Sequence, residues 1–117
     1  MSTTVVIQIG NSDDKLTQRE WAKFVEELHF VVHKSFSSVH FFGGAPSDSP
    51  YQNWCAVGEI EDDLWKFNKW DSLDEWMYNI VRPYLSDLTL RYRQDSIAMT
   101  IGGTEFVKAS KEGASDV

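Results

Sequence analysis

The sequence predicts an α+β fold from three observations. Strand-like runs of apolar and β-branched residues occur at four places, two amphipathic helical stretches lie between them, and the order along the chain is strand, helix, strand, strand, helix, strand. This order is that of a ferredoxin-like βαββαβ sandwich, in which a four-stranded antiparallel sheet carries two helices on one face. The 117 residues suffice for one domain. We expect it to span residues 1–107, with residues 108–117 as a disordered tail without core residues.

The first strand is predicted at residues 5–9, where apolar side chains alternate between two faces, and the turn Gly10-Asn11-Ser12 ends it. Thr17 and Glu20 have the spacing of a capping box, so a helix is expected to begin there. At about 100° per residue, one stripe of that helix is apolar: Trp21, Phe24, Val25, Leu28 and Val32. The stripe predicts that the helix packs on the sheet.

Two further strands are predicted at residues 39–42 and 54–60, separated by the turn-rich residues 43–53. A second helix is expected from Asp71 or Ser72, because Ser72 and Glu75 repeat the capping-box spacing. Its apolar stripe is predicted to contain Leu73, Trp76, Met77, Ile80 and Tyr84.

The end of the second helix and the last strand complete the predicted fold. Pro83 is expected to kink or end the helix. Residues 88–92 fit both a last helical turn and an alternating strand, and we favour the helix. The fourth strand is predicted at residues 96–101, with Ile97, Met99 and Ile101 facing inward.

Composition excludes several classes of function. The 11 basic residues against 18 acidic ones leave a net charge of −7, so duplex nucleic acid is not expected as a partner. No apolar run approaches the roughly 20 residues that span a bilayer, and the first residues lack the pattern of a signal peptide, so we expect a cytoplasmic protein without a membrane partner. The single cysteine, Cys55, excludes an intramolecular disulfide and a multi-cysteine zinc site.

The predicted topology brings three connections to one end of the sheet: residues 10–16, 43–53 and 93–96. Their amide, hydroxyl and charged groups suit a polar small molecule, such as a nucleotide-like metabolite or signal. The candidate ligand-binding residues are Asn11, Ser12, Asp13, Asp14, Lys15, Tyr51, Gln52, Asn53, Arg93, Gln94, Asp95 and Ser96. Arg93 and Lys15 would take an anionic part, and Tyr51 or Trp54 would supply a stacking face. For each residue the alternative is that turns are built from these residue types.

No catalytic residue, metal or cofactor is predicted. Asp13, Asp14 and Asp95 offer oxygen ligands for a divalent cation, but the sequence has no calcium-loop pattern, and the helix dipole already explains the first two. Cys55 lies in an apolar strand with no histidine tied to it, so we interpret it as a core residue rather than a nucleophile.

The histidines give no metal site. His29 and His33 have a spacing that can bind zinc on a helix, yet they lie to the side of the apolar stripe without a neighbouring cysteine, so we interpret them as surface residues. His40 follows Val39 on the second strand and faces either the helices or open water.

The alternative function is an inhibitor that binds a basic protein. Phe30 lies about 180° from the core stripe of its helix, which indicates a partner surface. Residues 59–75 place acidic groups around Trp65, Phe67 and Trp70, a composition that suits binding to a basic protein. The other interpretation of this segment is a loop that folds its aromatic rings back onto the sheet.

A homodimer is also expected, because an antiparallel sheet with one uncovered face invites association through that face. The residues expected on this face are Val6, Gln8, His40 and Phe42.

Three motifs carry a resemblance to a known group: VVIQIGNSDDKLTQ at 5–18, YQNWC at 51–55 and YRQDSIA at 92–98. They are similar to motifs of small single-domain proteins encoded by actinobacteria and their phages. The resemblance covers about residues 4–107 in outline, and it implies an actinobacterial or phage origin and no catalytic residue. For a viral chain, a phage accessory or anti-defence role, such as sequestering a host signalling nucleotide, would suit a small non-catalytic domain.

Overall fold

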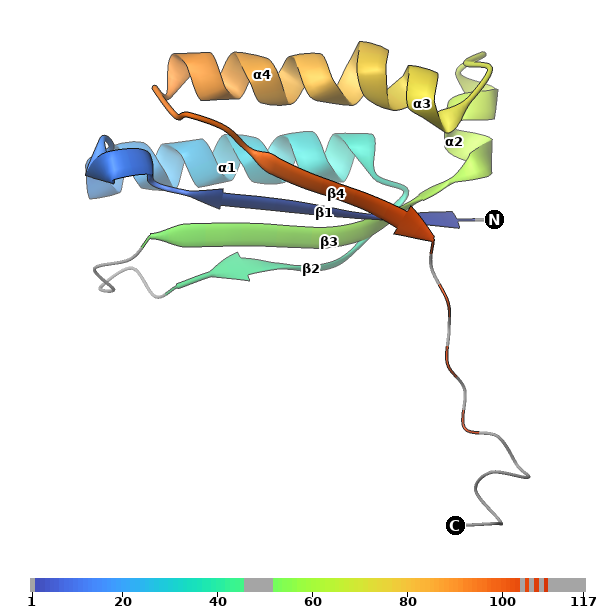
Figure 1. The fold of residues 1–117 in the computed structure, drawn as a ribbon, viewed down its shortest axis with the longest axis horizontal. Helices are drawn as coiled ribbons and strands as arrows, with labels where there is room; N and C mark the ends of the chain where they lie inside the picture. Colours follow the sequence, from blue (N-terminus) through green and yellow to red (C-terminus); the bar gives the residue numbers. More distant parts are fainter. Residues whose placement is uncertain (1, 46–51, 104, 106, 108, 110–117) are drawn as a thin grey trace.

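The computed structural model describes residues 2–45, 52–103, 105, 107 and 109, which form an α+β fold (Figure 1). Most of the expected tail therefore lies outside the described residues. The strands are β1 (Ser2–Gly10), β2 (Ser38–Gly44), β3 (Asn53–Glu61) and β4 (Ala98–Gly103). The helices are the 3-10 turn η1 (Ser12–Asp14), α1 (Gln18–Ser35), α2 (Asp62–Phe67), α3 (Leu73–Trp76), the π-helical η2 (Met77–Val81) and α4 (Arg82–Arg91). No helix in these ranges is long and apolar enough to cross a membrane.

The strands form one antiparallel sheet in the order β2-β3-β1-β4. β1 is central: Val5 lies opposite Gly58 of β3 on one side and opposite Ile101 of β4 on the other. Because side chains alternate along a strand, Val5, Ile7 and Ile9 all point to the same face, where they are buried. Figure 1 shows α1 and α4 side by side on one side of this sheet.

The first helix follows the sequence prediction. The Glu20 backbone N–H donates to the Thr17 hydroxyl, and the Glu20 carboxylate accepts from the Thr17 backbone N–H, so the expected capping box is present. Phe24, Leu28 and Val32 of the predicted stripe are fully buried. This packing against the apolar face of β1 forms the core.

Pro83 does not end the second helical region, which was one of the two outcomes expected for it. The chain remains helical through this residue to Arg91, so the helical interpretation is confirmed for residues 88–91, and Tyr92 is the C-cap. In η2 the Arg82 backbone N–H donates to the Met77 carbonyl, five residues earlier. A π-turn inserts one residue into the helix and rotates all later side chains by about 100°. The expected Tyr84 is consequently 45% exposed, and the buried stripe continues instead through Val81, Leu85 and Leu88.

The faces of β2 also differ from the prediction. The pairing of β2 with β3 skips one residue between Val39 and Phe41, which is a β-bulge at His40. After the bulge the faces are exchanged, so Phe42 lies opposite Ala56 on the helix side and not on the uncovered face as expected. Its ring contacts His29 of α1, with centroids 4.0 Å apart.

The same contact corrects the interpretation of His29 as a surface residue. His29 is half-buried, its Nε2 atom is buried without a hydrogen-bond partner, and its ring lies 4.3 Å from that of His33. Burial lowers the pKa of His29 below its ordinary value of 6.5, and the neighbouring His33 lowers it further.

Acidification should therefore destabilise the fold through His29. Below pH 6.5 the unfolded chain binds a proton at His29 more readily than the folded one, so the free energy of unfolding should fall as pH falls from 6.5 toward 5. Urea unfolding of the wild type and of a His29→Gln variant across this range measures the effect, and the variant should lose part of the pH dependence. His33→Gln is the matched control and should keep most of it, because burial is the larger cause. An unchanged pH dependence in His29→Gln would contradict the assignment.

Candidate functional site

The three connections predicted to converge do meet at one end of the sheet. The Asn11 side-chain amide donates to the Gln52 side-chain oxygen, which joins the first connection to the second. The Ser12 backbone N–H donates to Gln94 Oε1 over 2.8 Å, which joins the first to the third. Lys15 Nζ lies 3.1 Å from Asp95 Oδ1.

Asn11 organises the turn between β1 and α1. Its Nδ2 donates to the Leu16 carbonyl over 2.9 Å, and its Oδ1 accepts from the Leu16 backbone N–H over 3.0 Å. Its backbone N–H donates to the Gln52 carbonyl over 3.2 Å. An asparagine that bonds to nearby backbone groups is a common turn device. The Asn11 amide is therefore engaged in holding two connections together.

Gln94 holds the third connection in the same way. Its side chain is 8% exposed; Oε1 accepts from Ser12, and Nε2 donates to the Tyr92 carbonyl over 2.9 Å. The position follows from the end of α4, where the Gln94 backbone N–H donates to the Thr89 carbonyl and Arg93 adopts a left-handed conformation with φ of 53°. This is the Schellman pattern of helix termination, with arginine where glycine is usual.

The two cations expected to meet an anionic ligand have carboxylate partners within the chain. Arg93 donates to Glu20 Oε2 over 2.8 Å and to the Lys15 carbonyl over 3.3 Å. The pKa of Glu20 is lowered, first by the Thr17 backbone N–H and then by Arg93. Since Lys15 pairs with Asp95, both cations stabilise the contact between connections.

The end of α4 is also fixed by Tyr92. Its ring stacks on Phe24 of the core with centroids 4.8 Å apart, and its hydroxyl donates to the Glu27 carboxylate. Burial, followed by this hydrogen bond, raises the pKa of Tyr92 to about 12. The segment that leads from α4 into β4 therefore begins at Tyr92, a residue whose side chain is fixed against α1.

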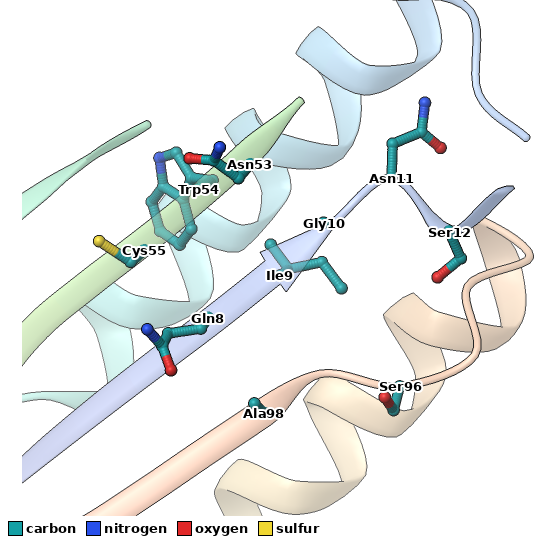
Figure 2. Close-up of a pocket in the computed structure, with 10 residues that line it drawn as sticks. All are labelled: Gln8, Ile9, Gly10, Asn11, Ser12, Asn53, Trp54, Cys55, Ser96 and Ala98. Carbon is teal, nitrogen blue, oxygen red and sulfur yellow. The ribbon is translucent and has the colours of Figure 1, made fainter. Parts of the chain in front are cut away.

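Beside this network lies a hollow of about 600 Å³ (Figure 2). It is lined by Gln8, Ile9, Gly10, Asn11, Ser12, Asn53, Trp54, Cys55, Ser96 and Ala98. The ladder between β1 and β4 ends at the pair Gln8 and Ala98, whereas β1 continues beside β3 to Gly10. Over its last residues β1 thus has a backbone edge without a β4 neighbour, and Figure 2 shows the segment at Ser96 diverging from it. None of the lining residues carries a charged side chain.

The hollow uses only part of the predicted residue set. Asn11, Ser12, Asn53 and Ser96 line it, whereas Asp13, Lys15, Gln52, Arg93, Gln94 and Asp95 do not. Tyr51 and the side chain of Asp14 lie outside the described residues. The prediction missed Gln8 and took Cys55 for a core residue; Cys55 is half-buried and lies directly opposite Gln8 in the sheet. Strand alternation, which places both on the face away from the helices, is the signal that would have found them.

The structure exposes only some of the aromatic residues that were predicted to form a partner surface. Phe30 is 67% exposed and Phe67 86% exposed. Trp65 and Trp70 instead pack partly buried against the core, where residues 62–67 form helix α2 and not the expected loop. The acidic segment thus presents a smaller aromatic surface than its composition indicates.

No group of three or more histidine, cysteine, aspartate or glutamate side chains that could hold a metal ion occurs within the part of the chain that the structure describes.

Replacing Asn11 by alanine should destabilise the fold by about 2 kcal/mol, because it leaves partly buried groups of Leu16 and Gln52 without partners. Asn68→Ala is the matched control: Asn68 makes one exposed hydrogen bond to the Leu64 carbonyl, and its loss should cost less than about 1 kcal/mol. Urea unfolding measures both. Equal effects would show that Asn11 does not organise the end of the sheet.

The uncharged hollow and the hydrogen-bonded connections behind it are the features on which a function has to rest. Comparison with known proteins adds no relative: the chain matches no family model, no curated protein and no solved structure.

Proposed function

We propose that the chain binds a polar small molecule in the hollow at the end of the sheet and does not catalyse a reaction on it. The observation that carries this proposal is the lining: among the described residues it supplies amide, hydroxyl and backbone groups in a space of about 600 Å³ but no charged side chain. Such a volume lies within the range of small-molecule sites. The nucleophilic groups of this lining are the Cys55 thiol and the hydroxyls of Ser12 and Ser96, and no histidine or carboxylate stands among the lining residues to activate them.

The lining favours a ligand whose bound part is neutral and planar. Gln8 presents one acceptor and two donor hydrogens, and Ser96 adds a hydroxyl. The Asn53 side-chain oxygen already accepts from the Ala45 backbone N–H, so Asn53 contributes its two donor hydrogens. The free edge of β1 adds backbone groups with fixed directions. Nucleobases and amides carry matching alternating donors and acceptors, so a nucleoside-like molecule is the substance class that fits best.

The hydrogen bonds behind the hollow support binding by pre-organising its walls. Asn11 and Gln94 hold the ends of three connections before any ligand arrives. A site that is already ordered loses less conformational entropy on binding. The polar residues that do not line the hollow thus still serve the proposed function.

A ligand search should use the full chain purified without denaturation. Native mass spectrometry would detect a co-purified molecule, and titration with adenosine, guanosine, cytidine and uridine, followed by backbone amide NMR, would test the class directly. We expect shifts at Gln8, Ser96 and Ala98. A folded protein that carries no molecule and responds to none of the four nucleosides would overturn the proposal.

Gln8→Leu should weaken binding about tenfold, because it removes a hydrogen-bonding amide and leaves the ligand group unpaired. Asn68→Leu is the matched control, since it removes the same kind of amide group at an exposed position outside the hollow and outside the sheet. Affinities come from the same NMR titration. Equal loss in both variants would move the site away from Gln8.

We further propose that the topology is ferredoxin-like. The strand order β2-β3-β1-β4 supports this, because from the opposite edge it reads β4-β1-β3-β2. The connections support it as well: α1 joins β1 to β2, β3 follows β2 as the next element along the described chain, and the helices α2 to α4 join β3 to β4.

Binding of a basic protein is a second candidate, favoured by α2. This helix begins with Asp62 and Asp63, buries none of its own residues and carries the 86% exposed Phe67. Phe67→Ser should abolish salt-sensitive capture of a basic protein by the immobilised chain, because it removes the apolar anchor. Leu90→Ser, at a residue 78% exposed on α4, is the control and should have no effect. Capture that is insensitive to salt, or lost equally in both variants, would exclude this surface.

A further inference from the structure

We propose that two copies of the chain pack through the face of the sheet that the helices leave uncovered, and that the partner copy covers the mouth of the hollow. The dimer itself does not depend on the proposed ligand. It rests on the composition, the charge and the size of this face.

The uncovered face is defined by strand alternation. Since Val5, Ile7 and Ile9 point to the helices, their neighbours in β1 and the residues opposite those neighbours point away. The central part of this face consists of Thr4, Val6, Gln8, Cys55, Val57 and Thr100. An antiparallel sheet that meets water usually presents charged and polar residues there, whereas here valines occupy its centre.

The β-bulge adds an aromatic ring to the same face. Because the pairing skips at His40, Phe41 lies opposite Val57, and its side chain is 55% exposed. Phe41 therefore borders the valines of the centre on edge strand β2. Aromatic side chains next to small apolar ones are common anchors of protein interfaces.

The distribution of charged side chains favours this face over the helical layer as the contact between two copies. The chain carries a net charge of −7, so two copies repel each other, and a contact surface without charged side chains adds least to this repulsion. The carboxylate next to the central part of this face belongs to Glu59, which is 6% exposed and engaged with His40 Nε2 at 3.1 Å and Ser2 Oγ at 3.0 Å. Glu61 follows on the same face at the end of β3, away from the valines. The groove between α1 and α4, in contrast, is lined by charged side chains that include Glu26 and Asp87.

The size of the face indicates a reversible dimer. With strands of six to nine residues, a rise of about 3.4 Å per residue and a strand spacing of about 4.8 Å, one face covers roughly 500 Å². Two such faces bury about 1,000 Å², the lower limit for a specific interface. We therefore expect dissociation in the micromolar range rather than an obligate dimer.

The face and the hollow share residues. Gln8, Cys55 and Ala98 line the hollow and also point away from the helices. A second copy on this face would lie over the opening and exclude water from a bound molecule. Ligand binding and dimerisation are then thermodynamically linked. A bound ligand favours the dimer, and the dimer binds the ligand more tightly than the monomer does.

Sedimentation of the full chain across micromolar concentrations tests the dimer. The wild type should show a reversible monomer and dimer equilibrium, and Val57→Lys should weaken it at least about tenfold by placing an unpaired charge in the apolar centre. Phe30→Lys, at an exposed residue of α1, should leave it unchanged. If Val57→Lys fails to fold, Phe41→Ser at the rim should still weaken the dimer. A wild type that stays monomeric, or a dimer broken by Phe30→Lys alone, would overturn the proposal.

The thiol of Cys55 provides an independent readout, since it lies on this face and is half-buried in the single copy. Its rate of reaction with a disulfide reagent should fall as the protein concentration rises. A rate that does not depend on protein concentration would show that no second copy covers the face. The nucleoside titration is a separate measurement, so the ligand and the dimer can each fail without the other.

Discussion

Burial of one face of β1 under α1 is the interaction on which the rest of the molecule depends. β1 is paired on both sides, and Val5 and Ile7 are fully buried beneath Phe24 and Leu28. A slip of one residue in either ladder would turn this apolar set outward, so the packing fixes the register of β3 and β4. The same alternation decides what the opposite face presents, and the last residues of β1 carry the turn that Asn11 organises. The alternation of side chains along β1 thus determines the core, the uncovered face and the position of the hollow.

The two cations at the end of the sheet are paired with carboxylates of the same chain. Arg93 is held by Glu20, and Lys15 by Asp95, and neither cation lines the hollow. Exposed pairs of this kind contribute little to stability, but they hold both cations in contacts between connections. For the ligand site proposed above, recognition would then rest on the direction of hydrogen bonds rather than on charge.

Local signals explain what the sequence could predict, and tertiary contacts explain what it could not. The start of α1 was predictable because Thr17 and Glu20 bond to each other, and the convergence of three connections followed from chain order and handedness. The bulge at His40 and the π-turn before Pro83 each add one residue to a regular pattern, and this moved Phe42 and Tyr84 to faces that periodicity does not predict. At the site, sequence cannot distinguish an amide that waits for a ligand from one already bonded within the chain, which is why Gln94 was predicted to contact a ligand directly.

The register between β1 and β4 also has a consequence for how the molecule is made. Thr3 pairs with Gly103, so the central strand meets one of its two partners only after β4, far along the chain, has been synthesised. Contacts between residues so distant in sequence form late and slowly, because a long loop must close first. β3 and α1 can cover β1 earlier, whereas Ser96 and Ala98 arrive with the last strand. The hollow is therefore completed only when β4 joins the sheet, and the ligand site proposed for it would not exist in a nascent chain before that step.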